Sequence, residues 1–148
     1  LIRPVGGWLS DKINSGAKVT AISTFAQILA TLAVAYFVIQ ARNSATPEAY
    51  WWPFFASFMV LFLTTGIGNG STFRSIPYIF NKEQAGPVLG WTAAIAAYGA
   101  FIIPKVFGQQ IKSGTPEYAL YGFAIYYLVC LILNWWYYQG PKAEVKNP

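Results

Sequence analysis

Two arginines beside apolar sequence are the residues with the most chemical content in this chain. Arg3 stands eight positions before Asp11, in a segment, Leu1–Ser10, that reads as the end of a helix. At ~1.5 Å per residue, Arg3 lies ~12 Å inside the helix end, near the midplane of a ~30 Å hydrocarbon core. A charge at that depth faces a cavity or a partner. Because the guanidinium is a planar fork of donors, it suits a planar, oxygen-bearing anion, although an ion pair with a carboxylate outside this chain is the alternative.

Arg74 poses the same question within the polar, glycine-rich segment Gly66–Arg74. It stands eight residues before Lys82, and its neighbours include hydroxyl and amide groups. We expect a structural or gating role for Arg74 near one mouth of the protein, rather than contact with a ligand. Asn69 and Ser71 could donate hydrogen bonds to a ligand, but such residues also bridge membrane helices.

Several kinds of chemistry lack their usual residues. The chain has no histidine and a single cysteine, Cys130, so no internal disulfide and no His-ligated metal are expected. None of the four charge-free runs holds an Asp or Glu, which leaves no carboxylate proton relay in them. The net charge of +5 is spread over loops and tail rather than gathered for nucleic acid. We therefore expect no cofactor, no metal, no nucleic acid partner and no enzymatic activity.

The elements that position these residues are long apolar segments. Charged residues make up 10% of the chain, against ~25% in ordinary soluble domains. Four charge-free runs each exceed the ~20 residues that a bilayer-spanning helix needs. Such runs must be helices or closed barrel strands, and their lack of alternation selects helices. The runs are Val19–Ala41, Ala49–Phe73, Gln84–Pro104 and Tyr118–Pro141.

The predicted fold class is therefore an all-α membrane protein. A transmembrane part over residues 1–140 is expected to hold four full transmembrane helices plus the end of a fifth, and a polar tail follows over 141–148. Lysine and arginine are more frequent on one side of these helices, five residues against three, which puts the C-terminus in the cytoplasm. The predicted helices are 1–10, 19–41, 52–80, 87–107 and 117–139.

Small residues recur where helices must approach closely. Gly66 and Gly70 are four positions apart, as are Gly86 and Gly90. The second pair opens a stripe of small residues that either packs against another helix or also lines a substrate path. Pro104 removes one backbone hydrogen bond, so it marks a hinge or a static bend.

Three stretches together resemble the nitrate/nitrite porter family of the major facilitator superfamily. Gly7-Trp-Leu-Ser-Asp11-Lys12 resembles the superfamily's Gly-x-x-x-Asp-Arg/Lys loop motif, in its looser copy between helices 8 and 9. The segment from Gly90 to Lys105 resembles the second nitrate signature, in helix 11. Gly66–Phe73 resembles helix 10 of that family, and Arg3–Gly7 resembles the end of helix 8. The resemblance covers nearly the whole chain.

The resemblance implies the C-terminal part of a twelve-helix transporter in a plasma (bacterial inner) membrane, with the N-terminal half outside this sequence. Nitrate or nitrite would cross by alternating access, and Asp11 would pair with a helix end in the missing half. Another small or organic anion as substrate, or a membrane subunit that does not transport, are the alternatives. The expected partners are the small inorganic anion, the lipid bilayer and the missing N-terminal half. The expected substrate-binding residues are Arg3, Gly90, Ala94, Asn69 and Ser71. The expected gating and helix-packing residues are Gly7, Asp11, Lys12, Gly66, Gly70, Arg74, Gly86, Gly99 and Pro104.

Overall fold

The computed structural model describes residues 2–148, and these form helices without any strand. Four of the helical segments are long and apolar enough to cross a membrane. The predicted all-α class and the four long helices are thereby confirmed. In chain order, the elements are α1 (Arg3–Ile13), α2 (Gly16–Asn43), the 3-10 helix η1 (Pro47–Tyr50), α3 (Trp51–Ile79), α4 (Lys82–Lys112), α5 (Pro116–Asn134) and the π-helical turn η2 (Trp135–Gln139).

Helix α1 extends beyond its predicted end at residue 10. Asp11 and Lys12 lie in its last turn rather than in a loop. The helix stops at Asn14, whose left-handed conformation (φ 55°) lets its N–H bond back to the Asp11 carbonyl. Helix α2 begins two residues later, and the Ser15 hydroxyl caps it by accepting from the Lys18 N–H at 3.2 Å.

Helix α4 is also longer than predicted, at both ends. The expected turn over residues 81–86 is helical from Lys82 onward, because the Asn81 carbonyl accepts the N–H groups of Gln84 and Ala85. At the other end the helix continues past Pro104 to Lys112. A charge-free run marks the part of a helix that can lie in lipid, whereas the hydrogen-bonded helix continues into the charged residues on either side.

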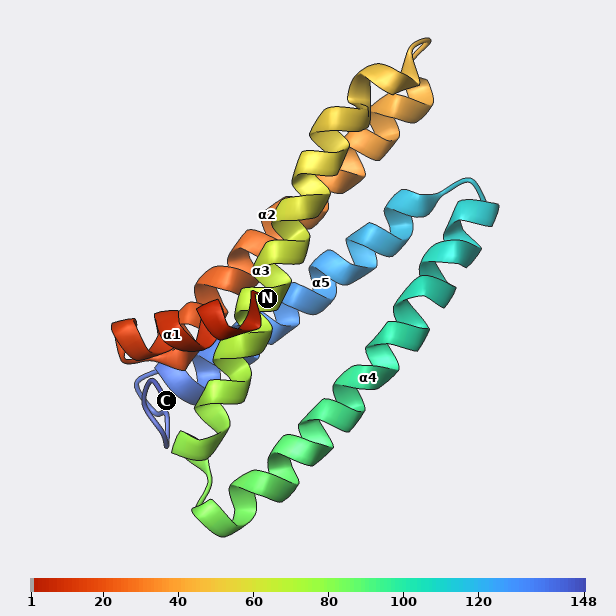
Figure 1. Cartoon of the computed structure of the whole chain (residues 1–148). Coiled ribbons are helices and arrows are strands. Elements are labelled where there is room, and N and C mark those ends of the chain that lie inside the picture. Colours follow the sequence, from red (N-terminus) through yellow and green to blue (C-terminus); the bar gives the residue numbers. More distant parts are fainter. Residues whose placement is uncertain (1) are drawn as a thin grey trace.

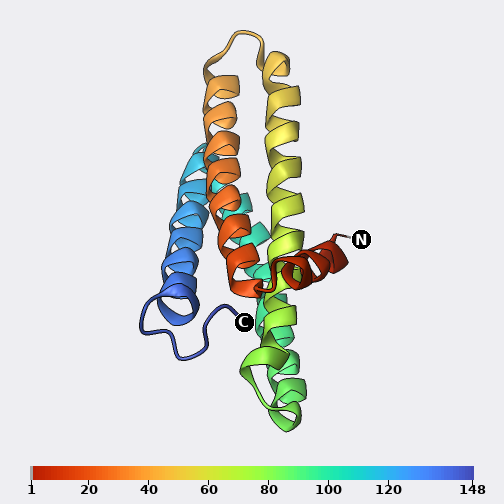
Figure 2. The same cartoon turned by 90° about the vertical axis from the view of Figure 1, so that its left-hand side faces the viewer.

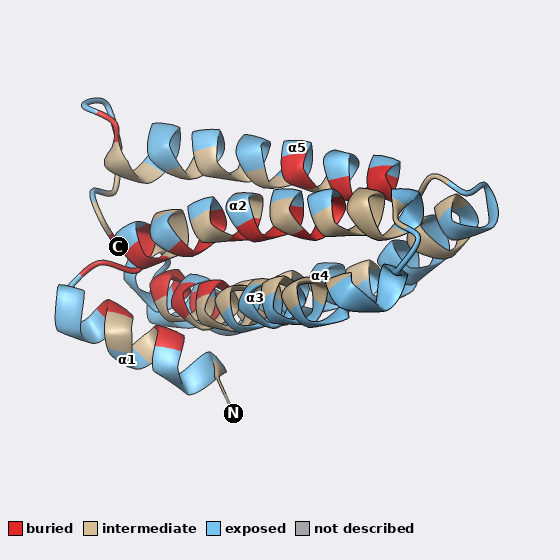
Figure 3. Ribbon diagram, turned by 90° about the horizontal axis from the view of Figure 1, so that it is seen from above, coloured by how far each residue is buried: buried red, intermediate tan, exposed pale blue. Residues whose placement is uncertain are grey.

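Helix α2 is the centre of the arrangement. It packs antiparallel to α3 along most of its length, and α5 lies along another of its faces (Figures 1 and 2). Helix α4 runs from the end of α3 to the start of α5 and diverges from the bundle between them (Figure 1). Buried residues accordingly follow α2 and the sides of its neighbours that face it (Figure 3).

The core of the bundle lies between α2 and α5. Val34, Ala35 and Leu120 are almost fully buried there. Phe54 and Phe107 pack against this cluster from α3 and α4. Most other large apolar side chains are exposed on the outer faces of the helices. In a bilayer this arrangement costs little, because lipid tails are as apolar as the side chains that they meet.

Helix α1 crosses α3 at a steep angle instead of running alongside it (Figures 1 and 2). The two backbones touch where each carries a glycine. A Cβ atom on Gly6 would collide with the Ile67 carbonyl, and one on Gly70 would collide with the Arg3 carbonyl. Only glycine permits this approach, so the crossing point is fixed by Gly6 and Gly70.

We predict that Gly6→Ala destabilises the intact membrane protein by about 1–3 kcal/mol, because the added methyl group meets backbone that cannot move aside. Gly7→Ala is the matched control, since nothing lies within 4 Å of its added Cβ atom in the described part of the chain. Both changes raise helix propensity equally, so their difference isolates the steric term. Thermal unfolding in detergent would measure it. Equal stability of the two variants would contradict the crossing.

Candidate functional site

Arg3 lies at the α1–α3 crossing, with its carbonyl group against Gly70. Its predicted depth assumed that α1 follows the membrane normal, and the steep crossing removes that assumption. The position of Arg3 is better given by its distance along α3 from the end of that helix. Gly70 precedes the end of α3 at Ile79 by nine residues, so the Arg3 carbonyl group lies ~13 Å along α3 from the end of that helix.

The Arg3 side chain is exposed, and it forms no ion pair within residues 2–148. The other two arginines do: Arg42 pairs with Glu117, and Arg74 pairs with Asp11. Arg3 is therefore the one arginine in the described part of the chain whose charge no carboxylate balances. Its guanidinium donors are therefore not engaged by a carboxylate of residues 2–148.

The expected substrate-binding residues divide into two groups. Asn69 lies on α3 near Gly70, and its Oδ1 atom is buried without a hydrogen-bond partner among the described residues. Gly90 and Ala94 lie exposed on α4, and α1 contacts α2 and α3 but not α4 within residues 2–148. The structure thus brings Arg3 close to the glycine-rich part of α3 and does not bring it to α4.

Ser71 belongs to a helix interface instead. Its hydroxyl is fully buried, lies 2.9 Å from the Gly68 carbonyl and 2.7 Å from the Thr20 hydroxyl of α2. With both partners supplied by the protein, Ser71 joins α3 to α2. The structure leaves its hydroxyl no free position toward a ligand.

Three of the residues expected to serve gating, Asp11, Lys12 and Arg74, lie at one end of the bundle. The Arg74 Nε atom donates to Asp11 Oδ1 at 2.8 Å, which ties α3 to the last turn of α1. The guanidinium also stacks on Tyr78, with Cζ 3.9 Å from the ring centroid. Lys12 lies over the Trp8 ring at 5.2 Å. The resemblance gave Asp11 a partner in the missing half, whereas the structure gives it one inside the chain.

The small residues of α4 have a different environment. An added Cβ at Gly86 or Gly90 would meet nothing within 4 Å in the described part of the chain. An added Cβ at Gly99 would meet only the Ile103 side chain, at 3.8 Å. Pro104 lies within α4, eight residues before its end. The close packing expected for this stripe is therefore not made inside residues 2–148. On α3 it is made, since a Cβ added at Gly66 would lie 3.1 Å from the Ile2 side chain and one added at Gly70 would collide with α1.

A polar seam on α2 escaped the sequence analysis. Hydroxyl and amide side chains recur at intervals of three and four residues, so they share one helical face. That face is buried, and it includes Gln27, whose Nε2 atom lies 3.3 Å from the Cβ position at Gly68. The spacing of these side chains indicates the seam, whereas the length of the charge-free run does not. The seam consists of Thr20, Ser23, Thr24, Gln27 and Thr31.

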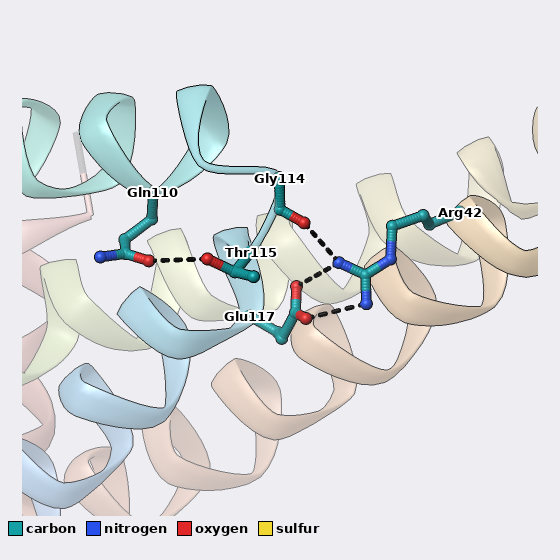
Figure 4. A network of polar contacts seen from close by, with 5 residues as sticks. All are labelled: Arg42, Gln110, Gly114, Thr115 and Glu117. Atoms are coloured by element: carbon teal, nitrogen blue, oxygen red, sulfur yellow. Dashed lines mark hydrogen bonds and ion pairs between the residues drawn. The ribbon is translucent and has the colours of Figure 1, made fainter.

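A clamp at the opposite end of the bundle was also missed. Arg42, at the end of α2, donates to both carboxylate oxygens of Glu117 at 2.8 and 3.0 Å (Figure 4). Its Nη1 atom also donates to the Gly114 carbonyl at 2.7 Å. The turn before α5 is braced further by the Thr115 hydroxyl, which donates to Gln110. Arg42 and Glu117 are 75 positions apart, so no local sequence pattern indicates that they pair.

Helical spans, close glycine contacts and ion pairs at both ends define a polytopic helical membrane protein. The chain belongs to the Major Facilitator Superfamily, whose model matches residues 1–148.

Its similarity to particular members is concentrated among proteins named for nitrate and nitrite. It is 36% identical over 146 residues to "Probable nitrate/nitrite antiporter NarK2" of Thermus thermophilus, covering 97% of this chain and 31% of that protein. It is 36% identical to "Nitrate/nitrite transporter NarU" of Escherichia coli (strain K12), covering 99% of this chain and 35% of that protein. A third relative, "Nitrite extrusion protein" of Bacillus subtilis (strain 168), is 28% identical over 94% of this chain and 32% of its own length. The chain thus spans about a third of the curated relatives that it matches. These matches confirm the resemblance to nitrate/nitrite porters that the three sequence stretches indicated.

We predict that Asp11 and Arg74 are energetically coupled in the intact protein. Asp11→Asn and Arg74→Gln should give a coupling free energy of about 0.5–1 kcal/mol in a double-mutant cycle of thermal unfolding, since Asp11 is largely exposed. A control cycle pairs Asp11→Asn with Lys82→Gln, because no ion pair joins Asp11 to Lys82 in residues 2–148. Equal coupling in the two cycles would mean that the ion pair does not form.

Proposed function

We propose that the chain is the C-terminal part of a porter that carries nitrate and/or nitrite across a membrane by alternating access. The names of its relatives support the substrate class. The single observation that carries the proposal in this chain is Arg3, an arginine at the level of Gly70 whose charge no carboxylate balances within residues 2–148. The proposed activity is transport of the anion with no covalent bond made or broken.

The anion is held by the forked donors of Arg3. Nitrate and nitrite are planar and carry oxygens in the geometry that a guanidinium matches with two parallel hydrogen bonds. Asn69, with its buried and unpartnered Oδ1 atom, supplies a second polar group near the same level of α3. An amide offers an NH2 donor as well as a carbonyl oxygen, so one orientation of Asn69 presents a donor to the anion.

The remaining walls of the Arg3 site come from the N-terminal half. The open stripe of α4, which includes Gly90, packs against that half and slides along it as the protein changes state. The resemblance to the nitrate/nitrite porters implies a second arginine, in the N-terminal half, that completes the anion site. Ser71 is not included in this proposal, because its hydroxyl is engaged between α2 and α3.

The Asp11–Arg74 pair keeps the α1–α3 junction closed at one mouth. Such a pair is weak when it is exposed to water, and Asp11 retains 64% of its side-chain accessibility. A weak junction suits a gate that must open in each transport cycle. We place this mouth in the cytoplasm together with the C-terminus, since Lys12, Lys82 and Lys142 gather on the same side. The membrane is the plasma membrane, which in bacteria is the inner membrane.

We predict that Arg3→Ala abolishes nitrate and nitrite uptake by the full-length protein in proteoliposomes. Losing a charge-assisted contact costs about 1.5–3 kcal/mol, or roughly tenfold to a hundredfold in affinity. Arg3→Lys should be strongly impaired, because lysine keeps the charge as a compact point and loses the fork. Tracer uptake is the readout, and the amount of inserted protein is measured separately.

The control for this experiment is Lys112→Ala, which removes a cation from the end of α4 and should transport normally. If Arg3 only balances a carboxylate in the missing half, Arg3→Lys should transport nearly normally and Arg3→Ala should mainly lower the amount of folded protein. Well-inserted Arg3→Ala with unchanged uptake would remove Arg3 from the binding site.

A further prediction concerns orientation. In the full-length protein with Cys130 replaced by alanine, Glu144→Cys should be protected from a membrane-impermeant maleimide in intact cells, and Ala45→Cys should react. Position 144 lies in the tail, and position 45 lies in the connection between α2 and α3 at the other end of the bundle. Reaction at 144 together with protection at 45 would reverse the proposed topology. Permeabilised cells are the control, since both cysteines should then react.

A further inference from the structure

The C-terminal tail folds back against the mouth that holds the Asp11–Arg74 pair. Its Asn147 N–H donates to the Tyr138 carbonyl at 2.9 Å, and the Pro148 oxygen accepts the N–H groups of Gly16 and Ala17 at the start of α2. The tail, α3 and the turn between α1 and α2 together line a pocket of about 470 Å³ that is open to the surface. Polar groups dominate its lining, which includes Asn14, Arg74, Tyr78, Lys146 and Asn147.

Arg74 presents unused donors to this pocket. Its Nε atom is taken by Asp11, and its guanidinium plane is held on Tyr78. No hydrogen bond to the two terminal Nη atoms is made by any of residues 2–148. Because only 12% of the side chain is exposed, water reaches these donors mainly through the pocket. A fixed guanidinium with one edge open is the geometry that binds two oxygens of an oxoanion.

The charges around the pocket call for an anion. Lys146 lines the same pocket as Arg74, and among the described residues Asp11 forms an ion pair with Arg74 while no carboxylate forms one with Lys146. Two positive charges beside the same pocket repel each other, and an anion bound between them is attracted by both. The aromatic ring of Tyr78 fixes one cation, while the other is carried on the tail.

Two asparagines, Asn14 and Asn147, also line the pocket. Both adopt the left-handed conformation, with φ of 55° at Asn14 and 54° at Asn147. The Asn147 Oδ1 atom is buried and lacks a hydrogen-bond partner among the described residues.

We propose that this pocket is an oxoanion-binding site, distinct from the site at Arg3. Arg74 donates to the oxoanion from its free Nη atoms, and Lys146 adds a second positive charge. The ligand is either the phosphate of a lipid headgroup or a free small oxoanion, since both present the same oxygens. The proposal does not depend on which substrate is transported. Because the tail and Arg74 line the same pocket, a bound anion also holds the tail against the gate.

The test uses the full-length protein carrying Arg3→Ala, so that binding at Arg3 does not contribute. Thermal unfolding in detergent is followed while inorganic phosphate, nitrate or phosphatidylglycerol is titrated, with zwitterionic phosphatidylcholine, whose net charge is zero, as the lipid reference. Saturable stabilisation by phosphate or nitrate identifies a free oxoanion. Stabilisation by phosphatidylglycerol alone identifies a headgroup. In either case, adding Lys146→Gln should weaken the apparent affinity about three- to tenfold.

The matched control is Lys142→Gln, which removes the same charge from the same tail outside the lining of the pocket. It should leave the titrations unchanged. Lys146 is exposed, so its replacement should not impair folding, and the unfolding temperature without ligand checks this point. Equal weakening by both lysine variants would reduce the effect to general charge attraction and overturn the site. Absence of any saturable stabilisation in the Arg3→Ala protein would overturn it as well.

Discussion

Close approach of backbones at α3 is the contact on which the rest of this structure depends. Between membrane helices the hydrophobic effect supplies little attraction, so helices associate through packing and hydrogen bonds that require small residues. Helix α3 carries glycine on two faces: Gly70 meets α1, and Gly68 meets the polar seam of α2. Because α1 is anchored at Gly70, the depth of Arg3 and the reach of Asp11 toward Arg74 both follow from this contact.

The polar seam of α2 has the complementary role. Hydroxyl groups buried between membrane helices need partners, and the Thr20 hydroxyl of the seam finds one in the Ser71 hydroxyl of α3. The Thr31 hydroxyl and the Asn69 carbonyl oxygen are buried without a partner among the described residues. The seam is therefore hydrogen-bonded to α3 through Thr20. The Asn69 amide, which lies near Gly70, keeps unused hydrogen-bonding capacity.

The two ends of the bundle are held with different strength. At one end Glu117 is buried, with 8% of its side chain exposed, and receives two hydrogen bonds from Arg42. Separating that pair would leave a desolvated carboxylate, which is costly. At the other end Asp11 is largely exposed and receives one bond from Arg74. Such a pair breaks with little loss because water replaces the partner. The proposed gate therefore lies at the end where rearrangement costs less.

The sequence by itself determined the fold class, the four long helices and the close-packing role of the α3 glycines, because charge-free length and small-residue spacing are local properties. It also picked out Arg3, since an arginine in such a segment is costly wherever the helix points. The tertiary structure alone decided which groups meet. The pairing of Arg42 with Glu117, the pairing of Asp11 with Arg74 and the engagement of Ser71 by Thr20 join residues more than fifty positions apart. The steep crossing of α1 depends on two backbones that meet in space, and no periodicity within either helix contains that angle.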